Sequence, residues 1–166
     1  AHSSQYVAAE IHYLVHERGV DQIIFNDDTF TLDRARVQQI CEAILSRGLK
    51  VAWFCFARAD TVTRELLALM RRAGCYSIGF GIESGDPEIM RRINKKITLE
   101  QSRQAVAWAN ELGLKTQCFF VFGNPGESEE TIERTVAFAL ELEPVLAFFN
   151  MLVPYPGTES YSLQFI

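Results

Sequence analysis

Apolar positions along this chain alternate between segments with helical spacing and short, nearly continuous runs. Four times, a helical segment ends at a glycine, and an apolar run begins after two further residues. These glycines are Gly19, Gly48, Gly74 and Gly113. Glycine adopts the left-handed conformation that closes a helix without a Cβ penalty, so each glycine predicts a helix end. The sequence therefore predicts helices and strands in alternation.

The apolar runs predict five strands. They are residues 22–25, 51–56, 77–82, 116–122 and 145–153. Apolar side chains follow one another along these runs instead of alternating with polar ones, which is typical of a parallel sheet covered on both faces. Parallel strands joined by helices form either an open sheet or part of a barrel, and the alternation alone leaves both open.

The predicted helices carry recognisable start signals. Residues 98–101 form a capping-box sequence, residues 86–87 place an aspartate before a proline, and Ser128 and Thr31 are expected N-caps. The helices after these last two caps have apolar stripes with helical spacing. The stripes are Val37, Ile40 and Ile44 in one helix, and Ile132, Val136 and Leu140 in the other.

Composition limits the classes of protein that fit. The 166 residues are 48 % apolar and 22 % charged, which excludes a disordered chain, a collagen-like fibre and a disulfide-scaffolded miniprotein. The net charge of −5 disfavours non-specific nucleic-acid binding. No apolar run of the sequence approaches the roughly 20 residues that cross a bilayer. We expect one domain over residues 1–166, with no membrane partner and no evident nucleic-acid partner.

Cysteine usage favours a reducing compartment. The chain has four cysteines, Cys41, Cys55, Cys75 and Cys118, and no two of them form a Cys-x-x-Cys pair. We interpret them as reduced, buried, small apolar side chains. A cytoplasmic location is therefore expected.

Polar and glycine-rich segments follow every predicted strand. In parallel α/β folds, ligands bind where the carboxyl ends of the strands meet the turns into the helices. Here those turns mix charge, glycine and proline, whereas the turns at the opposite ends of the strands, such as residues 49–50, are short and bland. The five turns are residues 26–30, 57–60, 83–86, 123–127 and 154–158. This asymmetry predicts a site on one rim of the sheet.

Charged residues in these turns have a structural and a functional interpretation. Asp27 and Asp28 either cap the following helix or face a ligand, and two adjacent aspartates alone are weak evidence for a cation site. Arg58 either pairs with Asp60 or faces a ligand. Glu83 directly follows its strand, where a buried charge needs a partner, so a ligand-facing role is favoured.

The remaining candidates are a turn, a lysine pair and an aromatic group. Residues 123–127 form either a plain tight turn or a backbone that a flat ligand approaches closely. Lys95 and Lys96 are either the solvated end of a helix or functional lysines. We expect barrel packing, not a substrate platform, from the aromatic residues of the last two strands. These are Phe119, Phe120, Phe122, Phe148 and Phe149.

Taken together, seven motifs between residues 5 and 160 resemble the radical S-adenosylmethionine (SAM) enzymes. The resemblance is greatest to the branch that often carries an upstream cobalamin-binding domain. In chain order, the motifs are Asp27-Asp28-x-Phe30, Arg58-Ala59-Asp60, Ala73-Gly74-Cys75, Gly81-Ile82-Glu83-Ser84-Gly85, Asn94-Lys95, Gly123-Asn124-Pro125-Gly126-Glu127 and Pro154-Tyr155-Pro156-Gly157-Thr158.

The resemblance implies an α/β fold, a partial (β/α) TIM-like barrel with about five of six expected parallel strands and with helices outside. It implies a parent enzyme in which three cysteines hold a 4Fe-4S cluster, and SAM is reductively cleaved to a 5′-deoxyadenosyl radical. A flavodoxin- or ferredoxin-type reductant is the implied partner, and cobalamin would come through a separate domain. Substrate and reaction type stay open.

The resemblance also assigns cofactor contacts to nine positions in these turns. They are Asp27 and Asp28 for the SAM amino group, Arg58 and Lys95 for its carboxylate or for substrate, Glu83 and Ser84 for its ribose or amino end, and Phe122, Gly123 and Val153 around the adenine.

One part of the family pattern is absent. The sequence contains no Cys-x-x-x-Cys-x-x-Cys loop, and none of its four cysteines can substitute: Cys55 and Cys118 fall within predicted strands and Cys41 within a predicted helix. We therefore expect a core without its first strand and cluster loop, truncated at both ends. This chain alone would hold no cluster. The strand edge at residues 22–26 would be exposed, which predicts self-association.

Two other interpretations remain. One is a non-catalytic nucleotide- or SAM-binding module that has lost the cluster. The other is a phosphate-binding barrel enzyme, which is disfavoured because Pro125 removes a backbone amide from the glycine-rich turn and no lysine follows.

Overall fold

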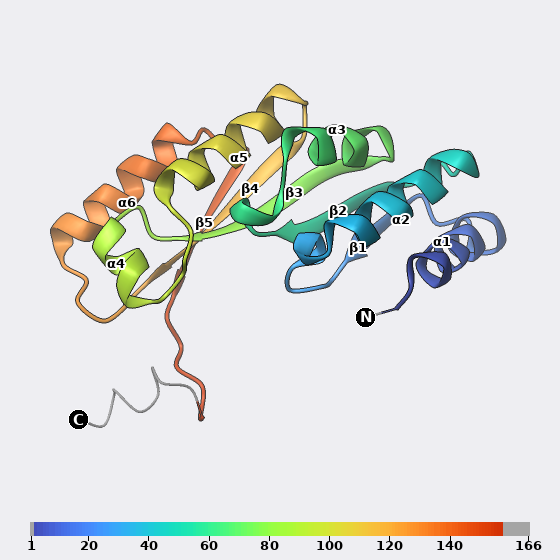
Figure 1. Cartoon of the computed structure of the whole chain (residues 1–166). Helices are drawn as coiled ribbons and strands as arrows, with labels where there is room; N and C mark the ends of the chain where they lie inside the picture. Colours follow the sequence, from blue (N-terminus) through green and yellow to red (C-terminus); the bar gives the residue numbers. More distant parts are fainter. Residues whose placement is uncertain (1, 158–166) are drawn as a thin grey trace.

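The computed structural model describes residues 2–157 and shows a five-stranded sheet with helices along one side (Figure 1). Short 3₁₀ turns over Phe30–Leu32 and Ala59–Thr61 follow the first two strands. The other elements are α1 (Ser4–Arg18), β1 (Gln22–Phe25), α2 (Arg34–Ser46), β2 (Ala52–Ala57), α3 (Arg64–Arg72), β3 (Cys75–Glu83), α4 (Pro87–Arg92), α5 (Leu99–Glu111), β4 (Lys115–Phe122), α6 (Glu129–Glu141) and β5 (Leu146–Met151).

All four strand pairs are parallel, and the strands lie side by side in the order of the chain, from β1 to β5. This order confirms the predicted partial (β/α) barrel with helices outside. The register between β3 and β4 shifts between Gly81 and Glu83, at the carboxyl end of the sheet. Such a bulge changes the direction of a side chain locally.

In the part of the chain that the structure describes, β1 and β5 form the two edges of the sheet. The side chain of Ile24 on β1 is 63 % exposed. The expected self-association through this edge stays a prediction.

Helix caps confirm most of the start signals. Ser128 and Thr98 accept the expected backbone hydrogen bonds, and Asp86 accepts two from the first turn of α4. The prediction for Thr31 was wrong, because α2 is capped by Asp33. Thr31 is fully buried in the 3₁₀ turn, where its hydroxyl bonds with that of Thr61 and is not free to cap a helix.

The buried face of α6 also differs from the prediction. Ile132, Val136 and Leu140 lie on its exposed side, and Leu140 is 73 % exposed. Thr135 and Phe138 face the molecule instead. The helix is turned this way because the hydroxyl of Thr135 meets polar groups of the turn that follows β3.

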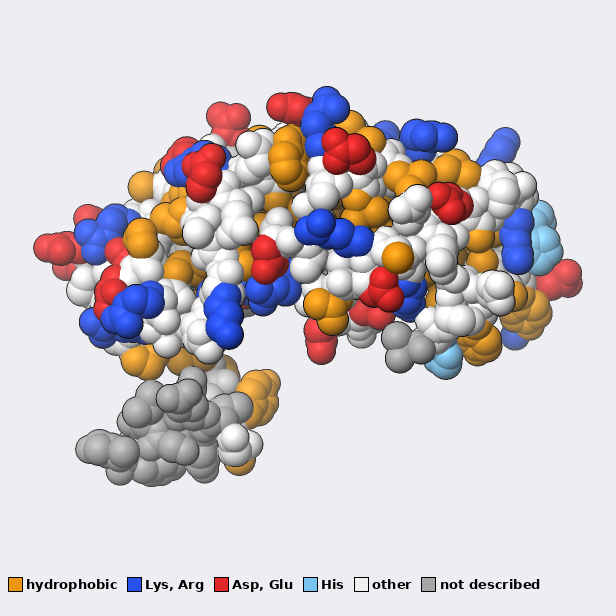
Figure 2. All heavy atoms as spheres, in the orientation of Figure 1, with side chains coloured by type: hydrophobic (Ala, Val, Ile, Leu, Met, Phe, Trp, Pro, Cys, Tyr) orange, Lys and Arg blue, Asp and Glu red, His pale blue; other side chains and the backbone are white. Residues whose placement is uncertain are grey.

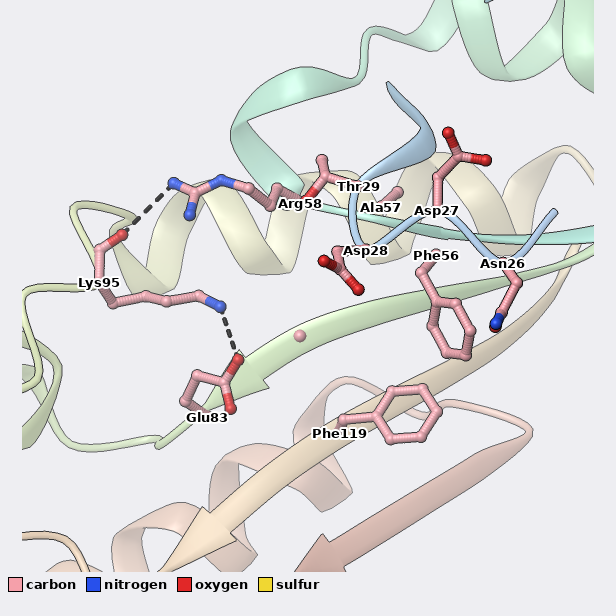
Figure 3. A pocket seen from close by; sticks show the side chains of 11 residues that line it. Asn26, Asp27, Asp28, Thr29, Phe56, Ala57, Arg58, Glu83, Lys95 and Phe119 are labelled. Atoms are coloured by element: carbon pink, nitrogen blue, oxygen red, sulfur yellow. Dashed lines mark hydrogen bonds and ion pairs between the residues drawn. The ribbon is translucent and has the colours of Figure 1, made fainter. Parts of the chain in front are cut away.

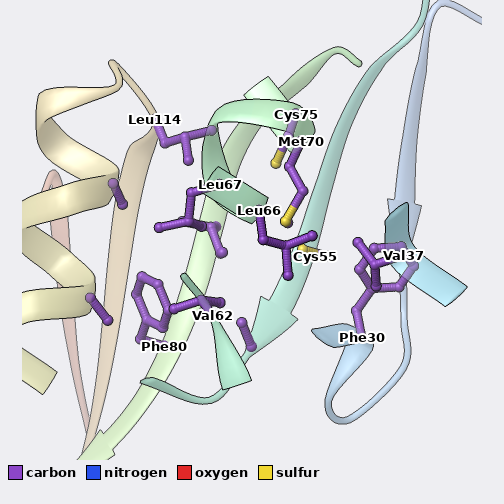
Figure 4. Packing of buried hydrophobic residues seen from close by; sticks show 14 of the residues in the cluster. Phe30, Val37, Cys55, Val62, Leu66, Leu67, Met70, Cys75, Phe80 and Leu114 are labelled. Atoms are coloured by element: carbon purple, nitrogen blue, oxygen red, sulfur yellow. The ribbon is translucent and has the colours of Figure 1, made fainter. Parts of the chain in front are cut away.

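The core fills the layer between the sheet and the helices (Figure 4). Trp53, Phe80 and Phe120 are among its largest fully buried side chains. All four cysteines are reduced and buried, as predicted. Burial raises the pKa of the Cys41 and Cys118 thiols to about 12.

Some aromatic residues of the last two strands are buried in the core, and others are partly exposed. Phe120 is fully buried, in agreement with the predicted barrel packing. Phe148 and Phe149 pack in part: their rings stack on those of Phe119 and Phe120, but the two residues are still 38 % and 42 % exposed. Both belong to β5, which has only β4 beside it among the described strands.

Acidic and basic side chains are interspersed over the face shown in Figure 2. The acidic side chains therefore do not form a single negatively charged patch on this face. Among the helices of residues 2–157, none has the length and apolar character needed to cross a bilayer.

Candidate functional site

A cavity of about 390 Å³ lies at the carboxyl ends of the strands (Figure 3). It contains charged side chains from the turns after β1 and β2, from the end of β3 and from the segment between α4 and α5. Its apolar wall comes from β2 and β4. The lining residues are Asn26, Asp27, Asp28, Thr29, Phe56, Ala57, Arg58, Gly81, Glu83, Lys95 and Phe119.

The two aspartates after β1 differ in their surroundings. Asp27 lies 3.8 Å from Arg36 of α2, an ion pair that turns its carboxylate away from Glu83. The carboxylate of Asp28 points toward the side of the cavity where Glu83 lies (Figure 3). Within residues 2–157, Asp28 makes no hydrogen bond or ion pair. Asp28 is therefore the aspartate whose carboxylate oxygens can accept hydrogen bonds from a ligand.

Glu83 and Lys95 form a close ion pair inside the cavity. The Lys95 Nζ atom donates to Glu83 Oε1 at 2.6 Å, and the two side chains are only 14 % and 25 % exposed. Glu83 has a φ of +73°, which is uncommon for a residue with a long side chain. Together with the bulge at the end of β3, this backbone conformation directs the carboxylate toward the lysine.

Arg58 is held by Asp60, as the structural interpretation predicted. Its Nε and Nη2 atoms donate to the two carboxylate oxygens at 3.1 and 3.0 Å. Hydrogen bonds in this fork raise the pKa of Arg58 and lower the pKa of the Asp60 carboxyl. Nη2 also reaches the carbonyl oxygen of Lys95 at 3.4 Å. The arginine is thus held by Asp60 while it still lines the cavity.

Gly81 leaves the space that the ion pair occupies. A Cβ at this position would lie 2.8 Å from Glu83 Oε1 and 3.2 Å from Lys95 Nζ. On the same strand, a Cβ at Gly79 would lie 3.0 Å from ring atoms of both Phe56 and Phe119. These two glycines of β3 therefore keep the floor of the cavity open.

Five of the nine predicted cofactor positions line this cavity, and four do not. The five are Asp27, Asp28, Arg58, Glu83 and Lys95. Glu83, Arg58 and Asp28 thus meet around one crevice, as the turn pattern predicted. The roles of these residues toward a cofactor stay predictions.

The other four positions lie outside this cavity. Ser84 is fully buried and bonds with Thr135 instead. The amide of Gly123 donates to the carboxylate of Glu127, and Phe122 stacks on a ring of β5. Val153 is 63 % exposed. The convergence predicted from the turns therefore does not extend to Gly123.

Sequence reasoning missed the apolar wall of the cavity. The sequence predicts Phe56 only as part of a strand, and Phe119 as barrel packing. Their contribution depends on the absence of side chains at Gly79 and Gly81, which lie between them on β3. The alternation of glycine along residues 79–81 was the available signal.

The described residues do not fit an iron–sulfur cluster. Among residues 2–157, no three histidine, cysteine or acidic side chains are grouped so that they could hold a metal ion. The four cysteines are buried, whereas a cluster needs several thiolates converging from one loop. SAM fits better, because the cavity combines carboxylates, cationic groups and an apolar wall.

Comparison with known proteins agrees with this geometry. The model of the radical SAM superfamily matches residues 2–139. An uncharacterized methyltransferase of Pyrococcus horikoshii is 39 % identical over 157 residues, which cover 95 % of this chain and 34 % of the relative. The anaerobic magnesium-protoporphyrin IX monomethyl ester cyclase of Cereibacter sphaeroides is 34 % identical over 156 residues, which cover 92 % of this chain and 26 % of the relative. The chain thus spans between a quarter and about a third of these relatives.

Solved structures show the same fold. The radical SAM methyltransferase TsrM of Kitasatospora setae, with cobalamin and a 4Fe-4S cluster bound, superposes with a TM-score of 0.83 at 21 % identity. That match covers 90 % of this chain and 31 % of TsrM. Coproporphyrinogen III oxidase HemN of Escherichia coli gives a TM-score of 0.71 at 20 % identity, covering 96 % of this chain and 43 % of HemN. The resemblance inferred from the seven motifs is confirmed, and the chain belongs to the radical SAM superfamily.

Proposed function

We propose that this chain is the SAM-binding part of a radical SAM enzyme, and that the cavity at the strand ends receives the amino-acid portion of SAM. The observation that carries the proposal is the charge balance of the cavity. Arg36 offsets Asp27, Asp60 offsets Arg58, and Lys95 offsets Glu83. Asp28 is left without an opposite charge in the part of the chain that the structure describes.

An uncompensated carboxylate favours a ligand with a net positive charge. SAM carries an ammonium group, a sulfonium group and a carboxylate, so its net charge is +1 at neutral pH. In this proposal Asp28 and Glu83 accept from the ammonium, while Arg58 and Lys95 face the carboxylate. Phe56 and Phe119 give the apolar part of the ligand a surface to pack against.

We propose further that the parent protein carries out radical SAM chemistry. When bound, SAM supplies a methyl and an adenosyl group activated by the sulfonium. The thiolates for the cluster would come from residues other than those described, since none of the described residues fits that role. A flavodoxin- or ferredoxin-type reductant and a cytoplasmic location belong to the same proposal.

Methyl transfer is the reaction class that the relatives support. The Pyrococcus relative is named a methyltransferase, and TsrM is a methyltransferase with bound cobalamin. We therefore propose a methyl-transfer reaction with cobalamin held by a separate domain. The cyclase from Cereibacter leaves a carbon-ring closure as the competing reaction.

A non-catalytic SAM-binding module is the second candidate. It is favoured by the absence of cluster ligands among residues 2–157. The coding sequence of the parent protein separates the two: a three-cysteine loop before the region matched here supports the enzyme, and a parent without such a loop supports the module.

The experiment for SAM binding is an NMR titration of the ¹⁵N-labelled chain with SAM. We expect amide shifts at residues 26–29, 81–83 and 95, because these surround the cavity. Asp28→Asn should weaken binding about tenfold, the loss of one charge-assisted contact of ~1.4 kcal/mol. The control is Asp21→Asn, the same change at an exposed position outside the cavity.

S-adenosylhomocysteine is the second ligand in this titration, because its thioether lacks the sulfonium charge. It should bind more weakly than SAM to the unmodified chain. Shifts confined to other parts of the sheet would contradict the proposal. Equal affinity of Asp28→Asn and Asp21→Asn for SAM would contradict it as well.

A further inference from the structure

The turn after β3, residues 84–86, is fastened to α6. All three of its residues are buried, and Gly85 comes closest to the helix. A Cβ on Gly85 would lie 2.6 Å from Phe138 Cβ and 2.8 Å from both the Arg134 carbonyl oxygen and Thr135 Cα. The turn and the helix therefore touch at backbone level.

The hydroxyl of Thr135 is the polar centre of this contact. It donates to the carbonyl oxygen of Thr131 at 2.9 Å and accepts from the Gly85 amide at 3.0 Å. A threonine hydroxyl has a single proton, so Ser84 must be the donor in the 3.1 Å bond between the two hydroxyls. Ser84 Oγ then accepts from the Asp86 amide. The Thr135 hydroxyl thus donates within α6 and uses both of its lone pairs to accept hydrogen bonds from this turn.

Asp86 provides a second connection. Its carboxylate is 5 % exposed, accepts from the amides of Glu88 and Ile89, and pairs with Arg134 Nε at 2.8 Å. The same aspartate therefore starts α4 and joins it to α6.

These contacts between the turn and α6 affect the chain that joins the two members of the ion pair in the cavity. Glu83 immediately precedes the turn and has a left-handed backbone conformation. Lys95 follows α4, a helix of six residues, and its amide donates to the Met90 carbonyl oxygen at the end of that helix. The chain between Glu83 and Lys95 is therefore anchored to α6 at the turn and at the start of α4.

We propose that Thr135 is a positioning residue for the Glu83–Lys95 pair, acting through the turn at residues 84–86. Thr135 does not line the cavity. This inference rests on the proposed function only where it concerns SAM; the positioning of Glu83 is a property of the free chain.

The central variant is Thr135→Val, which keeps the shape of the side chain and removes the hydroxyl. The Gly85 amide loses its acceptor and should exchange with solvent about tenfold faster or more. The Glu83 amide should shift in the ¹⁵N spectrum, and SAM should bind about tenfold more weakly, the equivalent of 1.4 kcal/mol. Thr135→Ser restores the hydroxyl and should return all three measurements toward those of the unmodified chain.

The matched control is Thr116→Val. Thr116 is fully buried, and its hydroxyl makes a 2.8 Å side-chain hydrogen bond with Asn110 away from the cavity. The Thr116→Val variant should be less stable than the unmodified chain, but the amide signals of Gly85 and Glu83 should not change. If Thr135→Val does not fold, the variant Arg134→Gln is used to test the positioning role instead. Arg134 is 54 % exposed, so this variant loosens Asp86 without altering the core.

The outcomes separate the two proposals. Faster exchange of the Gly85 amide together with a shifted Glu83 signal supports the positioning role, whether or not SAM binds. If neither the unmodified chain nor any variant binds SAM, only the proposal of SAM binding is overturned. Unchanged Gly85 and Glu83 signals in Thr135→Val, or in Arg134→Gln when it is the deciding variant, overturn the positioning role. Where the unmodified chain binds SAM, an equal affinity of Thr135→Val also overturns it.

Discussion

Gly81 and Gly85 lie on either side of Glu83, and the same substitution should have different consequences at the two sites. Neither glycine has φ in the left-handed region, so alanine introduces no backbone strain at either position. The difference lies in what a new Cβ would meet. At Gly85 it meets the backbone and a Cβ of α6, whereas at Gly81 it meets the ends of the Glu83 and Lys95 side chains.

Gly85→Ala should destabilise the fold. Overpacking a core costs ~1–3 kcal/mol, and contacts of 2.6–2.8 Å with atoms that cannot rotate away place this site near ~3 kcal/mol. Alanine restricts the unfolded chain and offsets ~0.4–1 kcal/mol of that cost. The expected loss is ~2 kcal/mol, which lowers the melting temperature by about 4–8 °C for a chain of this size.

Gly81→Ala should leave stability within ~1 kcal/mol of the unmodified chain. The flexible ends of Glu83 and Lys95 can move aside, and a partly exposed ion pair is worth at most ~1 kcal/mol. The gain from restricting the unfolded chain offsets part of that loss. The displaced carboxylate should instead shift the Glu83 amide signal and weaken SAM binding.

Urea unfolding followed by circular dichroism measures the first effect, and ¹⁵N spectra measure the second. Because both variants are glycine-to-alanine changes, each is the control for the other. Equal loss of stability in the two variants would refute the distinction between rigid and movable neighbours. So would a stable Gly85→Ala, because α6 would then not be in backbone contact with the turn.

Hydrogen bonds from Arg58 lower the pKa of the Asp60 carboxyl, so this pair stabilises the fold above the ordinary carboxyl pKa and loses that effect as pH falls below about 4. Asp60→Asn should flatten the pH dependence of urea unfolding in that range, and an unchanged slope would count against it. Burial raises the pKa of Cys41 and Cys118 to about 12, so iodoacetamide near pH ~8 should label them only after unfolding. Rapid labelling of the folded chain, detected by mass spectrometry, would contradict that burial. Leu140→Gln should change the unfolding free energy by less than ~0.5 kcal/mol, because the side chain is 73 % exposed. A loss above ~1 kcal/mol in urea unfolding would show that the side chain is part of the core.

The strands could be predicted from sequence because each is a nearly continuous apolar run, but the expected cover on both faces of the sheet is not found: the helices lie along one side (Figure 1), and every residue of β5 is exposed. The ends of α1, α2, α3 and α5 could be predicted as well, since a glycine in the left-handed conformation follows each of these four helices. The face of α6 could not be predicted in this way. An apolar stripe normally turns inward, but here Thr135 is buried because its partners are the Gly85 amide and the Ser84 hydroxyl, which belong to a distant part of the sequence.

The same limit applies to the candidate site. Parallel topology brings the turns after β1, β2 and β3 to one rim, so charged residues in those turns could be placed together from the sequence. Topology does not say which of them are already paired. The partner of Asp27 is Arg36 on the next helix, and only the structure distinguishes it from Asp28.

Backbone strain marks the same part of the molecule. Four residues other than glycine have positive φ in residues 2–157: Glu83, Asn94, Lys96 and Glu143. Asn94 and Glu143 follow the last cap residues of α4 and α6, where a left-handed residue is the usual way to end a helix. Glu83 and Lys96 have no such explanation, and each such conformation costs about 1–3 kcal/mol. Glu83 belongs to the ion pair of the cavity, and Lys96 is next to Lys95, the other member of that pair. The conformational cost is therefore concentrated where Glu83 and Lys95 are held together. Strain persists only where the surroundings enforce it, and the contacts of Thr135 and Arg134 with the turn at residues 84–86 are the surroundings that do so for Glu83.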